Sequence, residues 1–184
     1  MPRVHVGEQD GTPNVHLGSA RTGMSFPSIL NTLVSAPEPV LRRMIAGDDD
    51  TPADELVLLA NDADLTVRLA VARRVSIPFV VFTILVQDAS ALVRRTMASR
   101  HDVPAMLLAA LVEDDAISVR LKLAEHPSLD EDTLEQLVLD TEPLVRLLVA
   151  SRPSLSPSLL ERLAADPNGA VRRASRKRLA ITTA

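Results

Sequence analysis

The most regular polar feature of this chain is a series of six arginines spaced 26 residues apart, beginning at Arg42. An aspartate lies six residues before every one of them except the first, where Ala36 stands. Guanidinium groups that recur with carboxylates can bind external anions or form internal ion pairs. Because the pattern recurs along the whole array, whereas binding sites rarely occupy all repeats equally, we expect a structural ladder. Its predicted members are Asp62, Arg68, Asp88, Arg94, Asp114, Arg120, Asp140, Arg146, Asp166 and Arg172.

A second basic column lies six residues after the ladder arginines, with His126 in one copy and Asp48 in the first. It has two interpretations: interaction with the negative end of a helix, or a basic edge that binds nucleic-acid backbone or an acidic protein. The net charge of −4 and the absence of Trp and Tyr disfavour nucleic acid. The residues predicted for a partner-binding basic edge are Arg74, Arg100, Arg152 and Arg178.

Residues suited to catalysis or metal binding show no recognisable arrangement. Cysteine is absent, which excludes thiolate-held zinc and iron–sulfur clusters, and the four histidines lack metal-site spacing. The six glycines form no phosphate loop, and the serines have no companion histidine pattern. The run Asp48-Asp49-Asp50 is either a weak site for a hard cation or an exposed acidic loop, and we favour the loop. We therefore predict no catalytic residue, no metal, no cofactor and no enzymatic activity.

Apolar positions around the ladder arginines indicate a short helix in each repeat. The residue before each arginine and those three and four residues after it form one helical stripe. We expect the ladder aspartate at the N-cap of this helix. The column four residues after the arginine is alanine in five repeats: Ala46, Ala72, Ala98, Ala124 and Ala150.

A second helix is expected before the first one in each repeat, because apolar residues recur there three positions apart. Pro52, Pro78, Pro104, Asp130 and Ser156 mark its starts. Neither helix exceeds roughly three turns, so each must be stabilised by stacking on its neighbours. The expected columns are Leu30, Leu56, Phe82, Leu108, Leu134 and Leu160, then Leu33, Leu59, Leu85, Leu111, Leu137 and Leu163.

The fixed period and the helical columns predict an all-α fold: an α-solenoid of about six 26-residue two-helix repeats. We expect its superhelix to be right-handed, although the period itself does not give the handedness. The expected repeats lie near residues 26–50, 51–76, 77–102, 103–128, 129–154 and 155–180. Residues 1–25, with four glycines, predict a flexible arm in which Val4-His5-Val6 is a weak candidate strand. Residues 181–184 are expected to form a tail, and the polar last repeat, with Ser175 and Arg176 at core columns, is typical of a C-terminal cap.

The second helix is apolar on all sides in the middle of the array. Its outward columns carry Leu58, Val80, Ile84 and Met106, whereas the last two repeats have charged residues there. Apolar surface of this kind usually contacts another chain, so we predict that these four residues form a partner-binding patch. Two alternatives remain open at this stage: residues 1–25 fold back over the patch, or the helix is rotated and the columns are half buried.

The stretch VRLLVASRPSLSPSLLERLAADPNGAVRRA resembles the variant leucine-rich repeat family, and the Asp-to-Arg spacing is HEAT-like. The resemblance covers about residues 26–180. It implies repeats of two short helices without strands, and an Asp–Arg ladder that connects successive repeats. It implies nothing specific about a ligand.

These features together predict a non-catalytic repeat scaffold that mediates protein–protein interaction or self-association. A protein partner or a homodimer is expected, and nucleic-acid-backbone or acidic-partner binding along the basic edge is the alternative. No apolar run reaches the ~18–20 residues of a membrane span, and the N-terminal segment lacks the apolar core of a secretion signal. With the absence of cysteine, this predicts a cytoplasmic protein without membrane contact.

Overall fold

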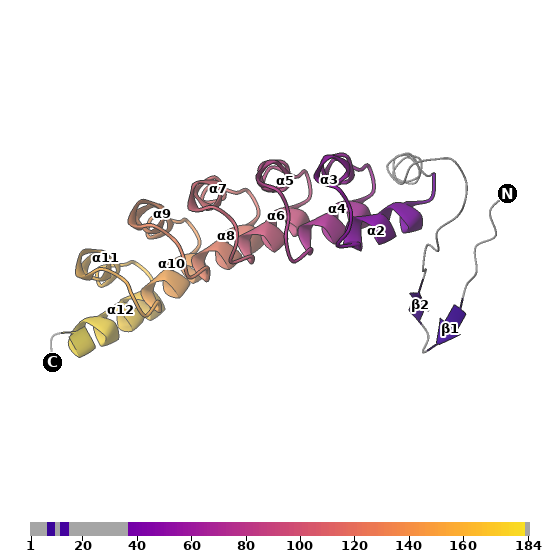
Figure 1. Ribbon diagram of the computed structural model, residues 1–184. Helices are drawn as coiled ribbons and strands as arrows, with labels where there is room; N and C mark the ends of the chain where they lie inside the picture. The colour runs from indigo at the N-terminus through magenta and orange to yellow at the C-terminus, as the bar shows by residue number, and fades with distance from the viewer. Residues whose placement is uncertain (1–6, 10–11, 15–36, 183–184) are drawn as a thin grey trace.

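The computed structural model describes residues 7–9, 12–14 and 37–182. Its helices form two rows along a gently bent rod, as Figure 1 shows. The row we call B contains the ladder arginines: α2 (Pro39–Gly47), α4 (Leu65–Ala72), α6 (Ala91–Ala98), α8 (Ile117–Ala124), α10 (Pro143–Ala150) and α12 (Gly169–Thr182). Row A lies on the outer side of the bend and comprises α3 (Ala53–Ala60), α5 (Phe79–Leu85), α7 (Ala105–Ala109), α9 (Glu131–Leu137) and α11 (Pro157–Leu163). The predicted helical solenoid is confirmed.

A short hairpin lies within the segment that was predicted to be a flexible arm. Strand β1 (Gly7–Gln9) pairs antiparallel with β2 (Thr12–Asn14). In the sequence, Asp10-Gly11 stands between them, a dipeptide favoured in two-residue hairpin loops. The weak strand Val4–Val6, the first predicted row-A helix with Leu30 and Leu33, and most of the arm lie outside the described residues.

The core lies between the two rows and is aliphatic, as the sequence predicted. The alanine column has no exposed surface at Ala46, Ala72, Ala98, Ala124 and Ala150. Small side chains let helices approach to near the ~8 Å lower limit of interaxial distance, and consecutive row-B helices pack directly on one another along the whole row. The valines before the ladder arginines are also fully buried: Val67, Val93, Val119, Val145 and Val171.

The ladder aspartates are not helix N-caps, so that prediction is wrong. The N-cap of α4 is Asp64 and that of α6 is Ser90, each two residues after the ladder aspartate of its repeat. The ladder aspartate lies in the preceding loop, where its Oδ1 accepts a hydrogen bond from the backbone N–H two residues ahead; this N···O distance is 2.8 Å for Asp62 and 2.7 Å for Asp88. This local turn orients the carboxylate away from its own helix.

The starts of the described row-A helices agree with the sequence signals. Pro52, Pro78 and Pro104 occupy the N-cap positions, and the Asp130 side chain accepts from the N–H of Thr133 at 2.9 Å. Proline at these positions costs little because the first N–H groups of a helix have no partner within it.

The last repeat differs from the prediction at its end. Helix α12 continues to Thr182, past the expected boundary at residue 180. Ser175 takes the apolar core position without exposing any surface, because its hydroxyl donates to the carbonyl of Leu160. Arg176, in the alanine column, is exposed and donates to the carbonyl of Ala164 at 3.1 Å.

Candidate functional site

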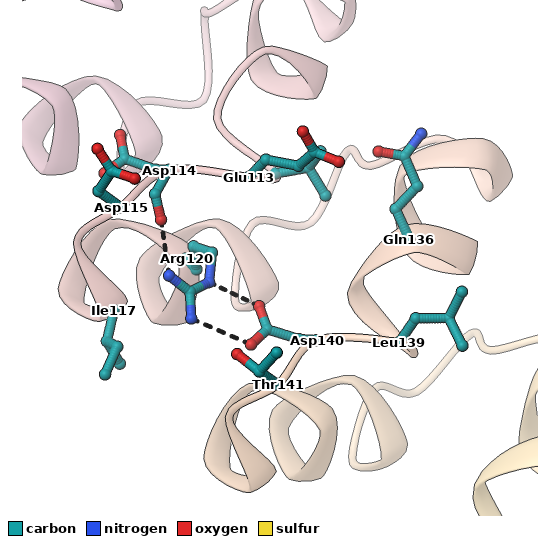
Figure 2. A pocket seen from close by; sticks show the side chains of 10 residues that line it. Glu113, Asp114, Asp115, Ile117, Arg120, Gln136, Leu139, Asp140 and Thr141 are labelled. Atoms are coloured by element: carbon teal, nitrogen blue, oxygen red, sulfur yellow. Dashed lines mark hydrogen bonds and ion pairs between the residues drawn. The ribbon is translucent and has the colours of Figure 1, made fainter.

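Each ladder arginine from Arg42 to Arg146 connects three segments of chain. Arg120 donates from Nε to Oδ2 of Asp140 at 2.7 Å and from Nη2 to Oδ1 at 3.2 Å, as Figure 2 shows. Its Nη1 donates to the backbone carbonyl of Asp114 at 2.6 Å. The carboxylate partner therefore lies twenty residues ahead, in the next repeat, while the aspartate six residues behind supplies only its carbonyl. The ladder joins neighbouring repeats.

Five such bidentate pairs run along the described array. Their Nε–Oδ2 distances are 2.6–2.7 Å, and the aspartate side chains expose only 3–8% of their surface. Two parallel charge-assisted bonds in a poorly hydrated site are the strong form of this interaction. The pairs are Arg42–Asp62, Arg68–Asp88, Arg94–Asp114, Arg120–Asp140 and Arg146–Asp166.

The ladder geometry shifts several pKa values toward the charged forms. Hydrogen bonds from Arg42 hold the pKa of Asp62 below its ordinary value, and those from Arg146 do the same for Asp166. Burial raises the pKa of Asp114, but hydrogen bonds from Arg94 and from the backbone N–H of residue 116 outweigh it, so the net direction is down. Asp62, Asp114 and Asp166 are therefore charged at neutral pH. The five paired arginines are occupied by their aspartates and offer little to an external anion. Arg172 of the last repeat has no such pair among the described residues, and its Nη1 donates to the carbonyls of Asp166 and Pro167 at 2.6 and 2.9 Å.

The second basic column also lies inside the array. Arg152 donates from Nη1 to the carbonyls of Ala124 and His126, both at 2.8 Å, at the C-terminal end of the preceding row-B helix. Arg74 makes the same type of contact with the carbonyl of Ala46 at 3.1 Å. Arg74 and Arg152 expose 7% and 8% of their surface. These side chains cap the exposed carbonyls at the ends of helices, and they have little accessible charge for a partner.

Arg100 and Arg178 belong to the same column. Arg100 reaches the Ala72 carbonyl at 2.9 Å and pairs with the exposed Asp102 at 2.6 Å. Arg178, in α12, donates to the carbonyl of Pro153. All four residues of the predicted basic edge thus contact the repeat before their own, which the helix-end interpretation explains and a free binding edge does not.

Two arginines of this column lack a full set of acceptors, and a histidine replaces arginine in one repeat. The Nε atoms of Arg74 and Arg152 are buried and have no hydrogen-bond partner among the described residues, and burial lowers the pKa of Arg152. His126 replaces arginine in one repeat, with its Nε2 2.8 Å from the Arg100 carbonyl and its Nδ1 accepting from the Ser128 N–H at 3.2 Å. Burial lowers the pKa of His126, which favours the neutral ring that these two bonds require.

The predicted apolar patch lies on three successive row-A helices. Leu58 on α3, Val80 on α5 and Met106 on α7 expose 56%, 47% and 70% of their surface. Ile84 is partly buried against the core, so the alternative of half-buried columns holds for this residue alone. Phe79, at the start of α5, is 55% exposed and was not included in the prediction.

A groove of about 610 Å³ lies between α8 and α9, where Figure 2 shows its lining. The exposed Glu113 and Asp115 and the apolar Ile117 and Leu139 surround the ladder arginine Arg120. The Arg120 guanidinium is occupied by its ladder contacts, so it is not available to bind an anion in the groove. Within residues 37–182, no group of three histidine or acidic side chains is arranged to hold a metal ion.

Comparison with known proteins agrees with this geometry. The family model of the leucine-rich repeat variant matches residues 143–168, one full period. A solved structure described as a leucine-rich repeat variant with a novel repetitive protein structural motif superposes with a TM-score of 0.66 at 32% sequence identity. Residues 143–168 form a variant leucine-rich repeat, and the fold of the array is similar to that solved structure.

The match covers 80% of this chain and 59% of the solved one, so this chain spans less than two thirds of the solved variant leucine-rich repeat protein. No curated protein sequence matches the chain. None of the described helices is long and apolar enough to cross a membrane.

One unusual residue of the array was missed by the sequence analysis. Glu55 on α3 is 6% exposed, and its Oε2 is buried without a hydrogen-bond partner among the described residues. Burial, and secondarily the charge of Asp54, raise the pKa of Glu55. The signal was available, because the same column holds the buried Val81 and Leu159 in other repeats.

Proposed function

We propose that the protein is a non-catalytic repeat scaffold that binds protein through the apolar patch of row A, formed by Leu58, Val80, Ile84 and Met106. One observation carries the proposal: three of these side chains are about half or more exposed on three consecutive helices. An isolated exposed aliphatic residue needs no explanation, but exposed aliphatic residues on successive helices of one row typically mark a contact surface.

The repeat architecture supports this role. Consecutive repeats stack into a rod with row A along its outer side (Figure 1). Val80 and Met106 occupy one column of the repeat, and Leu58 and Ile84 occupy a second column four residues further along the helix. Burying one aliphatic side chain of this size contributes roughly 1.5–3 kcal/mol before the costs of association. Leu58, Val80 and Met106 together can supply the centre of a protein interface.

The test begins with the oligomeric state of the full chain, measured by light scattering behind size exclusion at low and high salt. The variant Val80→Asp with Met106→Asp places two charges in the patch. The matched control, Leu139→Asp with Ile181→Asp, changes two residues that are 67% and 64% exposed elsewhere. A wild-type dimer that persists in high salt, and becomes a monomer in the patch variant but not in the control, supports the proposal.

Other outcomes are equally decisive. A dimer that survives both aspartates is formed by another surface. A monomeric wild-type protein excludes self-association, and cross-linking in cell extract then compares partner recovery by the wild-type chain and the patch variant. Equal recovery by the two would reject the patch as a contact surface.

A further inference from the structure

Charge is segregated between the two helical rows. None of the six described row-B helices contains an acidic residue, whereas α3, α9 and α11 of row A do. The protein as a whole carries a net charge of −4, whereas the helices of row B carry a net positive charge.

The ladder arginines account for only part of this positive charge. Five of the ladder arginines are paired with aspartates, which removes them from the exposed surface. A different face of row B is formed by the positions two before, one and two after, and five after each ladder arginine. The last three positions lie three, four and seven residues after the first, so all four lie on one side of a helix. We call this surface the row-B face.

The row-B face carries six basic side chains and one acidic one. Five of the basic residues are exposed and form no ion pair within residues 37–182, and they are Arg43, Arg73, Arg95, Arg173 and Lys177. The sixth, Lys122, pairs with the acid, Glu125, at 2.9 Å. This face therefore has a clear excess of positive charge that the interior of the protein does not neutralise.

Aliphatic side chains lie between these charges. Val40, Leu92 and Leu144 occupy the column two residues before the ladder arginine and expose 55%, 43% and 55% of their surface. Between α6 and α8, Leu92, Arg95 and Lys122 border a shallow depression of about 210 Å³. A ligand on this face would meet cations and apolar surface in alternation.

We propose that the row-B face binds an acidic segment of another protein, in which carboxylates alternate with aliphatic side chains. Carboxylates complement the unpaired cations, and the partner's aliphatic residues complement Val40, Leu92 and Leu144. A nucleic-acid backbone would satisfy the cations but leave the aliphatic positions unmatched, and row B has no aromatic residue on which a base would stack. The proposal concerns the inner side of the rod and is independent of the row-A patch.

A synthetic peptide provides the probe. Six helices spaced ~8–10 Å apart span ~40–50 Å, which an extended peptide of ~12–15 residues covers. A fluorescein-labelled peptide of alternating glutamate and leucine is titrated with the full chain, and binding is followed by fluorescence anisotropy. A peptide with glutamine in place of glutamate serves as its uncharged control.

Two variants separate charge from folding. Arg43, Arg95 and Arg173 are changed together to glutamine in one variant and to lysine in the other, and circular dichroism verifies that both fold. We expect the glutamine variant to bind roughly tenfold more weakly and the lysine variant to stay near wild type, because each exposed charge contributes modestly. Affinity should also fall as ionic strength rises from about 0.1 M to about 1 M, since the screening length shrinks from ~10 Å to ~3 Å.

Three results would overturn the proposal. The first is no binding of the acidic peptide at low salt, and the second is equal binding of the glutamate and glutamine peptides or of the wild-type and glutamine proteins. The third is a duplex or single-stranded DNA oligonucleotide that displaces the peptide at lower concentration than the unlabelled peptide does, which would assign the face to nucleic acid. The Val80→Asp and Met106→Asp substitutions should leave peptide affinity unchanged, so a failure here is distinct from a failure of the row-A patch.

Discussion

Removal of a central ladder carboxylate should destabilise the array far more than loss of a surface ion pair. Asp114 is 4% exposed at its side chain and receives the Nε and Nη2 donors of Arg94 at 2.6 and 2.8 Å. It also accepts the N–H of Ala116 at 2.9 Å. Asp114→Ala removes all three bonds at the junction of two repeats.

The magnitude follows from what remains after the substitution. Breaking a buried pair on one side typically costs 3–5 kcal/mol, but Arg94 keeps its bond to the Asp88 carbonyl and is 17% exposed, so water can reach it. We therefore expect a loss of about 2–4 kcal/mol, which lowers the melting temperature by about 5–15 °C for a chain of this size. Asp114→Asn should lose less than alanine, because its side-chain oxygen can still accept the Ala116 N–H.

The assay is urea unfolding followed by far-ultraviolet circular dichroism at pH 7. Arg94→Leu, Asp114→Leu and the two combined form a double-mutant cycle, and we expect the double variant to be more stable than the sum of the two single losses predicts. A loss below about 1 kcal/mol for Asp114→Ala would place the pair with exposed salt bridges and refute the reasoning from burial.

The acid dependence of the same group has a definite sign. Hydrogen bonding lowers the folded pKa of Asp114 below its unfolded value of about 3.9. Its contribution to stability is therefore fully present above that pH, and it is lost as the pH falls from there through the folded pKa. Asp114→Ala should flatten the acid limb of the stability profile.

Two further predictions concern the second column. Burial lowers the folded pKa of His126, so the contribution of its neutral ring to the free energy of unfolding is fully present above about pH 6.5 and is lost as the pH falls through the folded pKa. The urea midpoint should therefore be lower at pH 5.5 than at pH 7.5, and His126→Gln should reduce this difference. An unchanged difference would assign the effect to another group. Ser154→Asp places a carboxylate two residues after Arg152, as Asp102 is placed relative to Arg100, where it can accept from the Nε of Arg152 that has no partner among the described residues. We expect the free energy of unfolding at pH 7 to rise by about 1–2 kcal/mol in the same urea assay. No increase would show that the Nε does not need an acceptor.

Periodicity identified much of the fold, because the same positions of each repeat are buried against the neighbouring repeats. A buried alanine every 26 residues reports close contact between neighbouring helices, and a valine before each ladder arginine reports the core face. Each of these positions lies within a few residues of the ladder arginine of its repeat, and the pattern recurs often enough to be recognised from the sequence alone. The helix starts at Pro52, Pro78 and Pro104 were predictable for the same reason.

The roles of the charged columns were less accessible. Spacing shows that Asp62 and Arg68 recur together, but it does not show that Arg68 pairs with Asp88 instead. Likewise, Arg74 and Arg152 are as basic in sequence as Arg95, and only the packing of successive repeats buries the first two. The four arginines predicted to form a basic edge instead contact carbonyls of the preceding repeat, and exposed cations without an ion pair lie on the row-B face.

The sequence by itself determined the repeat, its two helices, its aliphatic core and the apolar series at Leu58, Val80 and Met106, because these depend on periodicity within one repeat. The tertiary structure alone decided which carboxylate each arginine meets, which cations remain exposed, and which carboxylate, Glu55, is left buried without a partner in the described part of the chain. The physical reason is that pairing and desolvation are set across the junctions between repeats, where groups twenty or more residues apart come into contact.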